Sequence, residues 1–313
     1  MSAVRPTAFR SVATKLGIGG GPLGGLFSPV SSETAEAVIE RAWEHGLRLF
    51  DVAPLYGHGR AERFVGHVLQ TKPRDEFVLS TKVGRLLRAE AAGEPSDFAE
   101  TEGVGPVFDF SAAGVRRSLE ESLERLGLDR VDVVYLHDPE EHLEQAMREA
   151  LPELVRLRDE GVVGGIGVGT NRVETVIRFV RETDVDCVLL ANRVTLLDRS
   201  GEAEALPLCV ERNVTVIAGG VFNSGVLASP QTSPTYEYAP APDDVRARAL
   251  ALERICERYG VPLAAAAVQF PLRHPAVVSV VIGVRNVIEL DENTAAFNTR
   301  LPTELWDELL ADE

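Results

Sequence analysis

Eight short apolar runs, separated by longer amphipathic stretches, are the feature that most constrains the fold of this sequence. The runs are KLGIGG from Lys15, LRLFDVA from Leu47, FVLSTKV from Phe77, VDVVYLH from Val131, VGGIGVG from Val163, CVLLAN from Cys187, VTVIAGG from Val214 and VVSVVIG from Val277. Such an alternation is typical of parallel strands joined by crossover helices. Eight units in 313 residues, with no low-complexity linker, predict one (β/α)8 barrel domain, of the TIM-barrel type, spanning residues 1–313.

Two of the amphipathic stretches carry clear helix signals. In SAAGVRRSLEESLERLG the apolar side chains recur at intervals of three and four, at Val115, Leu119, Leu123 and Leu126. Ser111 is placed to cap the start of this helix and Gly127 to end it. SSETAEAVIERAWEHG repeats the pattern, with Ser32 and Thr34 near its start and Gly46 at its end.

Two connections are too long to be simple crossovers. Segment 84–110 follows the third predicted strand, and segment 221–243 follows the seventh. Long loops in compact domains are usually functional or disordered, and both would overhang the barrel face that carries active sites. The glycine-rich GIGGGPLGG after the first strand lacks the features of a dinucleotide fingerprint, so we interpret it as a tight turn near the substrate.

Charge and cysteine content exclude several classes of protein. A formal charge of -16 disfavours binding to nucleic acid and to anionic membranes. Cys187, Cys209 and Cys256 lie far apart and form no CxxC motif, so neither disulfides nor a metal site are predicted. No apolar run approaches the roughly 18 residues of a membrane helix, and residues 1–17 lack the apolar centre of a signal peptide. These features predict a cytoplasmic protein, and they leave its oligomeric state open.

Four polar side chains fall where three neighbouring predicted strands end. Asp51, Lys82 and His137 end the second, third and fourth strands, and Tyr56 follows Asp51 by five residues. A buried carboxylate is costly unless it is paired, so Lys82 is the expected partner of Asp51. Taken singly, each charged residue also fits a structural ion pair, and His137 fits a packed core position. Together at one barrel mouth, the four side chains indicate a catalytic site.

These residues resemble the tetrad of the aldo-keto reductases, an Asp and a Tyr in D-[TSV]-A-x-x-Y-G, a Lys in [ST]-K and a His after the next strand. The resemblance runs across nearly the whole chain. Within that family, segments such as APLYGHGRAERFVG, LSTKVGRLL and GGVFNSGVLA are similar to those of D-threo-aldose 1-dehydrogenases, also called L-fucose or galactose-type dehydrogenases. Pyridoxal 4-dehydrogenases share much of this pattern.

The resemblance implies an NAD(P)-dependent oxidoreductase with Tyr56 as acid and base. An unperturbed tyrosine, with a pKa near 10, exchanges protons poorly at neutral pH. Lys82 would favour the tyrosinate, Asp51 would hold Lys82 in place, and His137 would bind the substrate oxygen. In oxidation Tyr56 would take the proton of an anomeric hydroxyl as hydride leaves C1, giving a lactone. The polar groups expected near the mouth are His58, Asp109, Asp138 and Asn223, and each could either bind a sugar hydroxyl or simply be solvated.

The same resemblance implies a set of cofactor-binding residues. Asn171 and Asn192 would hold the nicotinamide carboxamide, and Glu292 and Asn293 would lie at the adenine end. Gly219 stands where the family usually has an aromatic residue that stacks on the nicotinamide, so Phe222 is expected to compensate. The remaining expected contacts are Gly225, Gly283, Arg285 and Glu289, in the loops after the seventh and eighth strands.

The charge of the segment after the eighth strand predicts that NAD is preferred to NADP. A 2′-phosphate rewards arginine, whereas a carboxylate at Glu289 would repel it and accept hydrogen bonds from ribose hydroxyls. Arg285 nearby leaves use of both cofactors open. Three alternatives remain open for the activity itself: a pyridoxal 4-dehydrogenase, a general aldehyde or ketone reductase, and a non-catalytic barrel that binds a nicotinamide nucleotide as a sensor or subunit.

Overall fold

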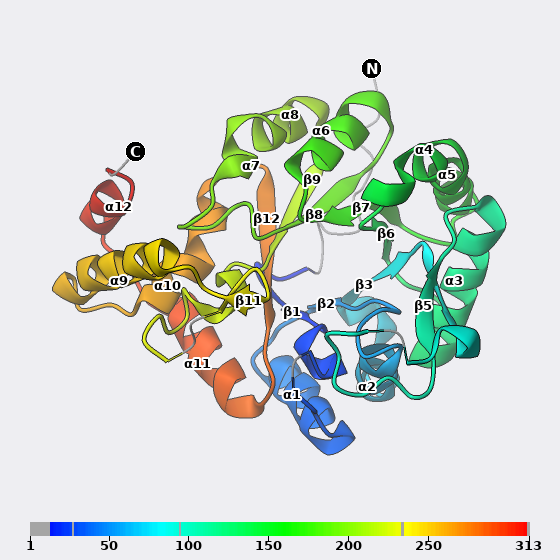
Figure 1. Cartoon of the computed structure of the whole chain (residues 1–313), viewed down its shortest axis with the longest axis horizontal. Helices are drawn as coiled ribbons and strands as arrows, with labels where there is room; N and C mark the ends of the chain where they lie inside the picture. The colour runs from blue at the N-terminus through cyan, green and yellow to red at the C-terminus, as the bar shows by residue number, and fades with distance from the viewer. Residues whose placement is uncertain (1–12, 27, 94, 233–234, 312–313) are drawn as a thin grey trace.

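A closed barrel of eight parallel strands is the centre of the structure (Figure 1), a computed structural model that describes residues 13–26, 28–93, 95–232 and 235–311. Around the barrel the strands follow the order β1 (Leu16–Gly19), β12 (Val277–Gly283), β9 (Thr215–Gly219), β8 (Cys187–Ala191), β7 (Gly165–Thr170), β6 (Val133–His137), β3 (Val78–Val83) and β2 (Leu49–Asp51). Each strand overlaps one of the eight apolar runs. The predicted (β/α)8 fold is therefore confirmed.

Helices surround the barrel and connect its strands (Figure 1). The α-helices are α1 (Ser32–Glu44), α2 (Arg60–Leu69), α3 (Ala112–Leu126), α4 (Leu143–Gln145), α5 (Leu151–Asp159), α6 (Val173–Glu182), α7 (Ser200–Ala203), α8 (Ala205–Arg212), α9 (Asp243–Arg258), α10 (Leu263–Gln269), α11 (Val287–Asn298) and α12 (Thr303–Leu309). The short helical turns are η1 (Pro22–Gly24), η2 (Arg74–Glu76), η3 (Ala89–Ala91), η4 (Glu140–His142), η5 (Ala146–Ala150), η6 (Asn223–Gly225) and η7 (Phe270–Arg273).

The helix caps follow the sequence signals closely, with one shift. Ser111 accepts a hydrogen bond from the Gly114 N–H at the start of α3, and Gly127 ends the helix with a left-handed φ of 62°. At α1 the capping side chain is Ser31 and not Ser32: the Ser31 hydroxyl accepts the Thr34 N–H at 3.3 Å. Ser31 has the extended backbone that a cap requires, whereas Ser32 is already helical.

Apolar side chains fill the barrel and the layer outside it. The inner cluster consists of Leu49, Val78, Val133, Tyr135, Cys187, Leu189, Ile217 and Val281. The neighbours of these residues along each strand point outward and pack beneath the helices, as the alternation of side chains in a strand requires. The barrel is thus a packed core, and substrates meet it only at its ends. All three cysteines are buried and unpaired.

Both long connections contain a β-hairpin of their own. Segment 84–110 forms β4 (Arg85–Arg88) and β5 (Gly105–Phe108), and segment 221–243 includes β10 (Thr235–Tyr236) and β11 (Ala239–Pro240). Both segments follow carboxyl ends of barrel strands. A bridge between Leu26 and Phe98 ties the first segment to the chain after β1. The two loops therefore overhang the mouth, as predicted.

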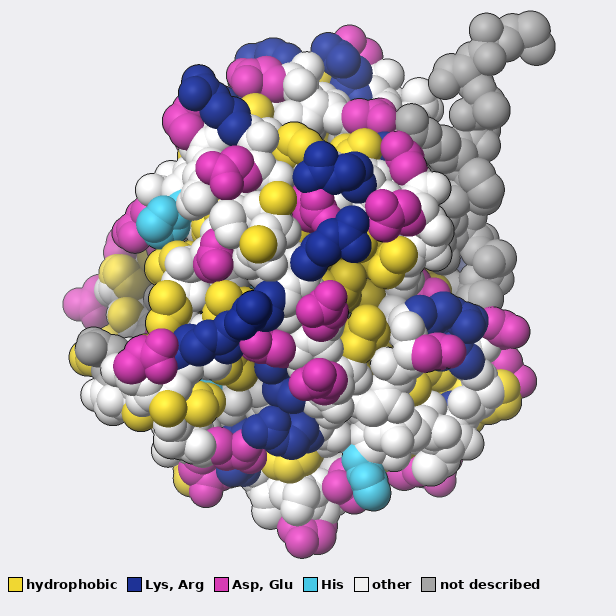
Figure 2. All heavy atoms as spheres, turned by 90° about the vertical axis from the view of Figure 1, so that its right-hand side faces the viewer, with side chains coloured by type: hydrophobic (Ala, Val, Ile, Leu, Met, Phe, Trp, Pro, Cys, Tyr) yellow, Lys and Arg dark blue, Asp and Glu magenta, His cyan; other side chains and the backbone are white. Residues whose placement is uncertain are grey.

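The surface carries both signs of charge in close mixture. On the face shown in Figure 2, basic and acidic side chains alternate with no large area of one sign. Ion pairs of the described residues at the surface include Arg116–Glu160 and Arg178–Glu144. Among the described residues, no helix is both long enough and apolar enough to span a bilayer. Residues 1–12, for which the sequence predicts no signal peptide, lie outside the described part of the chain.

Candidate active site

A buried ion pair lies at the carboxyl end of the barrel. Asp51 is the last residue of β2 and Lys82 is near the end of β3, so the parallel strands bring both side chains to the same mouth. The Lys82 Nζ donates to Asp51 Oδ2 at 2.6 Å and to the Val52 carbonyl at 3.0 Å. Ser80 donates to the other carboxylate oxygen at 2.7 Å. The carboxylate that interrupts the second apolar run is thus paired with the cation that the sequence predicts.

Tyr56 lies beside this pair on a tight turn after β2. The Lys82 Nζ is 4.5 Å from the centre of the Tyr56 ring, and the His137 ring meets the same ring edge-on at 5.8 Å. The glycine-rich turn after β1 packs directly under this segment. A Cβ on Gly24 would lie 2.5 Å from the Tyr56 carbonyl carbon, so only glycine fits there. The structure therefore brings together all four residues of the predicted tetrad.

Burial dominates the acidity of Tyr56. Removal from water raises its pKa to about 12, although the charge of Lys82 lowers it, as expected from the sequence. Asp51 raises the pKa further. The net shift is therefore opposite to the one that Lys82 alone would produce, and Tyr56 is protonated at neutral pH. Burial lowers the pKa of Lys82 itself, but the Asp51 carboxylate and Tyr56 together raise that pKa above its ordinary value.

His137 is neutral in this environment. Burial, together with the positive charges of Arg85 and Lys82, holds its pKa well below the usual range. A neutral imidazole has one N–H donor and one acceptor nitrogen, so it can bind a carbonyl or a hydroxyl oxygen without carrying charge. The Nε2 of His137 lies 3.5 Å from Asp138 Oδ2.

The loop 84–110 supplies an apolar wall to the site. Phe98 packs on Tyr56 with 6.2 Å between ring centres. His58 fixes this loop, because its Nδ1 lies 2.6 Å from the Val104 carbonyl oxygen and its Nε2 3.1 Å from the Ser96 hydroxyl. The prediction of His58 as a free polar group at the mouth is therefore wrong. Phe98 lies in an irregular segment, where no periodic pattern in the sequence marks it.

Two further polar groups expected at the mouth also have internal partners. Asp109 accepts hydrogen bonds from the backbone N–H and the hydroxyl of Ser111, at 3.0 and 2.6 Å, and so helps to begin α3. Asn223 is buried, and its amide donates to the Asn192 carbonyl at 3.4 Å. The carboxylate of Asp138, in contrast, is 40% exposed next to His137. Of the four groups predicted to meet a sugar, Asp138 is the one left facing solvent at the mouth.

Asn192 provides a buried side-chain amide at the carboxyl end of β8. Asn192 follows β8 with a left-handed φ of 64°, and its side chain is buried. Within the described chain neither polar atom of this amide has a well-formed hydrogen bond, although the amide interacts with the Tyr238 side chain. A buried unsatisfied amide is complementary to a carboxamide such as that of nicotinamide. Asn171 follows β7, and its carbonyl accepts the Arg193 Nε–H at 2.8 Å.

The residues after β9 that were expected to contact the cofactor lie at the end of the strand and around η6. Gly219 ends the strand and Gly225 closes η6 with a φ of 108°. Phe222 is half-buried and packs against the hydrophobic core. Tyr238, on the β10–β11 hairpin, is a residue that sequence reasoning does not identify. Its backbone N–H donates to the Ser224 hydroxyl at 3.0 Å, and its side chain interacts with the Asn192 amide from this second loop.

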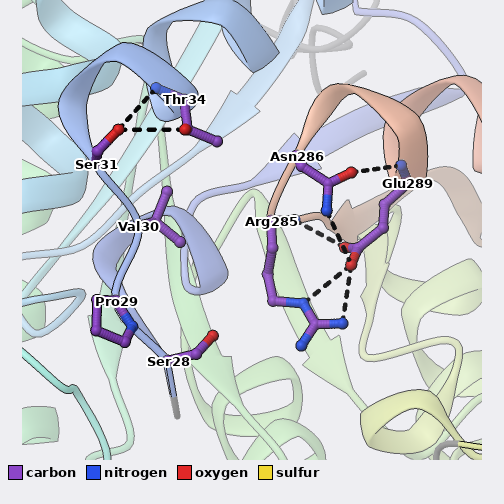
Figure 3. A pocket seen from close by; sticks show the side chains of 8 residues that line it. All are labelled: Ser28, Pro29, Val30, Ser31, Thr34, Arg285, Asn286 and Glu289. Atoms are coloured by element: carbon purple, nitrogen blue, oxygen red, sulfur yellow. Dashed lines mark hydrogen bonds and ion pairs between the residues drawn. The ribbon is translucent and has the colours of Figure 1, made fainter.

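A pocket of about 360 Å³ lies between the start of α1 and the start of α11 (Figure 3). Its lining consists of Ser28, Pro29, Val30, Ser31, Thr34, Arg285, Asn286 and Glu289. Glu289 accepts the Arg285 Nε–H at 3.0 Å and its backbone N–H at 2.9 Å, and Asn286 caps α11 by accepting the Glu289 N–H. The side chains of Glu289 and Asn286 therefore already occupy the backbone N–H groups of Arg285 and Glu289 at the start of α11.

The other residues expected at the adenosine end lie around this pocket. Gly283 ends β12, and a Cβ there would lie 2.6 Å from the Pro22 ring. Glu292 and Asn293 lie on the following turn of α11 and do not line the pocket.

Comparisons with known proteins agree with the barrel fold of this chain. The sequence model described as the aldo/keto reductase family matches residues 15–311. The chain is 43% identical to a D-threo-aldose 1-dehydrogenase from Pseudomonas sp, over 99% of this chain and 97% of that protein. It is 42% identical to a pyridoxal 4-dehydrogenase from Microbacterium luteolum, over 96% and 94%. Among solved structures, the holo form of an aldo-keto reductase from Bacillus halodurans superposes with a TM-score of 0.76 at 24% identity, over 96% and 92%.

Proposed function

Because this chain belongs to the aldo/keto reductase family, and is thus an NAD(P)-dependent oxidoreductase acting on CH–OH groups, we propose that it oxidises C1 of an aldose to a lactone. The observation that carries the proposal is the juxtaposition of Tyr56, the Lys82–Asp51 pair and a neutral His137 at one barrel mouth. The proposed substrates are D-threo-aldoses such as L-fucose. The proposal draws further support from the identity to the D-threo-aldose 1-dehydrogenase of Pseudomonas sp.

The proposed roles follow from the positions of the four side chains. His137 binds the anomeric oxygen and turns it toward Tyr56, and Tyr56 receives the hydroxyl proton. Lys82 stabilises the tyrosinate, which is the form of Tyr56 that accepts this proton, and Asp51 keeps Lys82 charged and in place. When bound, the oxidised nicotinamide supplies the hydride acceptor. Asn171 and Asn192 are proposed to hold its carboxamide, with Gly219, Phe222 and Gly225 around its ring.

The high pKa of Tyr56 gives the two directions of reaction opposite pH dependence. Oxidation requires the deprotonated tyrosine, and reduction requires the protonated one. Since burial raises the Tyr56 pKa to about 12, the proton-donating form dominates at neutral pH. Oxidation is therefore favoured by alkaline solution and reduction by neutral solution.

The substrate assignment predicts turnover of free sugars. We expect L-fucose, D-arabinose and L-galactose to generate reduced nicotinamide, with kcat/KM values at least about tenfold above that of pyridoxal. The measurement is the absorbance of the reduced cofactor in a panel of these sugars, pyridoxal and simple aldehydes, assayed with each nicotinamide nucleotide. Efficient turnover of pyridoxal without turnover of sugars would instead assign the activity of the Microbacterium luteolum relative.

The charge around Arg285 supports a preference for NAD. The positive charge of Arg285 is paired with Glu289, whose Oε1 lies 2.8 Å from its Nη2, so little of it is available to a 2′-phosphate (Figure 3). The Glu289 carboxylate is at the same time placed to accept hydrogen bonds from ribose hydroxyls. We propose that this pocket receives the adenosine ribose. Gly283 would lie on the side of β12, and Glu292 and Asn293 would lie on the side of the adenine.

Reversal of the charge at residue 289 should change the cofactor preference. We expect wild-type kcat/KM to favour NAD, and Glu289→Arg to shift the ratio toward NADP at least about tenfold, or about 1.4 kcal/mol. The measurement is kcat/KM for both cofactors with one saturating sugar. Glu33→Arg, an identical charge change on the first turn of α1 but outside the pocket lining, should leave the ratio unchanged. A wild type that favours NADP would contradict the preference.

A further inference from the structure

Asp138 is fixed beside His137 at the carboxyl end of the barrel. It follows His137 directly, and its Oδ2 lies 3.5 Å from His137 Nε2. Its backbone has a left-handed φ of 42°, a conformation that asparagine and aspartate tolerate better than most residues. Its N–H donates to the Gly169 carbonyl at 3.0 Å, which anchors the residue to β7. The carboxylate is therefore held at the mouth by the barrel.

Arg85 holds the side chain of Asp138. Its Nη2 donates to Asp138 Oδ2 at 3.0 Å, and its guanidinium lies 4.7 Å from the centre of the Phe108 ring. The Ser118 hydroxyl donates to the Arg85 carbonyl at 3.1 Å and fixes the backbone of β4. The arginine side chain is only 13% exposed. Phe108 and Asp138 together leave its guanidinium little freedom to turn.

The pair has hydrogen-bonding capacity to spare. Among the described residues, the contacts of the Asp138 carboxylate with Arg85 and His137 both use Oδ2, which leaves Oδ1 as an acceptor. A hydroxyl group of a substrate can donate a hydrogen bond to this free carboxylate oxygen. An ion pair whose carboxylate is 40% exposed contributes little to stability, so its position beside His137 fits a role in recognition.

We propose that Asp138, held by Arg85, is a specificity-determining residue that binds the hydroxyl on the carbon next to the reacting carbon. An oxygen bound to His137 sits on C1, and the adjacent Asp138 is then nearest to the group on C2. This inference rests on the proposed oxidation of aldoses. It would account for a preference for sugars over simple aldehydes, because a bound substrate that lacks the C2 hydroxyl covers the Asp138 carboxylate without giving it a hydrogen-bond donor.

The test compares two sugars that differ only at C2, D-arabinose and 2-deoxy-D-ribose. We expect the wild type to favour D-arabinose about 100-fold in kcat/KM, as for a hydrogen bond to a charged group. Asp138→Leu should lower kcat/KM for D-arabinose about 100-fold and change that for 2-deoxy-D-ribose less than about threefold, so that the preference disappears. Melting temperature and cofactor binding report whether the variant is folded. Should it fail to fold, Asp138→Asn, which keeps the shape, is expected to reduce the preference about tenfold.

A matched control distinguishes the loss of a direct contact between Asp138 and the substrate from a general change of charge near the site. Glu141→Leu removes one carboxylate from the same loop at an exposed position and should leave the preference intact. Equal losses on both sugars in Asp138→Leu, or an unchanged preference, would overturn the role of Asp138 while leaving the aldose activity standing. A wild type that oxidises neither sugar, nor any other aldose, would overturn the proposed function and this inference with it.

Discussion

Tyr56→Phe should lower kcat about 10²- to 10⁴-fold with every substrate and leave cofactor binding nearly unchanged. The substitution removes only the hydroxyl that is proposed to exchange the proton, and the phenylalanine ring keeps the packing against Phe98 and His137. The measurements are steady-state kinetics in both directions and a fluorescence titration with NAD. Wild-type kcat in the variant would remove Tyr56 from the mechanism.

Tyr135→Phe provides the control for this experiment. Tyr135 is also buried in the barrel, but it lies in the inner apolar cluster and its hydroxyl interacts with the Cys187 thiol. The same loss of a buried hydroxyl there should change kcat less than about threefold. A large effect at Tyr135 would mean that the loss at Tyr56 reflects general disturbance of the barrel rather than loss of the reacting group.

Lys82→Met is expected to reduce activity almost as strongly, for two separable reasons. The charge of Lys82 lowers the Tyr56 pKa, so its removal takes that pKa still further above the ordinary value, and oxidation then requires more alkaline solution. The loss also leaves the buried Asp51 carboxylate without its cation, which costs about 3–5 kcal/mol of folding free energy. The pH profile of kcat reports the first effect, and urea unfolding reports the second.

The double variant Asp51→Asn/Lys82→Met separates these effects. It removes both members of the ion pair, so most of the lost stability should return, because the asparagine side chain carries no charge that needs a partner. Activity should not return, since Tyr56 still lacks the charge that favours its ionised form. Recovery of both stability and activity in the double variant would show that Lys82 acts only as a structural partner of Asp51.

The barrel and the tetrad can be predicted because each has a local signal. Strands of a parallel sheet are buried on both faces, so each is a nearly continuous apolar run that is visible in the sequence. Asp51 interrupts such a run, and the energetic need for a partner points to Lys82 from the sequence alone. The cap of α1 differs from the prediction by one residue because Ser31 and Ser32 both have a capping hydroxyl, and only backbone geometry distinguishes them.

The loop contributions cannot be predicted because tertiary contacts determine them. Phe98, Arg85 and Tyr238 lie in segments without periodicity, and their approach to the site depends on hairpins and on the tether at His58. The direction of the Tyr56 pKa shift is hidden from sequence reasoning for the same reason. Burial dominates that pKa, and part of the burial comes from Phe98, which is distant in the sequence.

The 84–110 loop is a separate layer that is attached to the barrel by a few contacts. They include the hydrogen bonds of His58 to Val104 and Ser96 and the Leu26–Phe98 bridge, whereas the ion pair of Asp51 and Lys82 belongs entirely to the barrel. Exchange of this loop would therefore replace Phe98, which packs on Tyr56, and Arg85, which holds Asp138. The residues proposed to transfer the proton would stay on the barrel. A lineage or a protein engineer could in this way diversify the range of accepted substrates without rebuilding the chemistry.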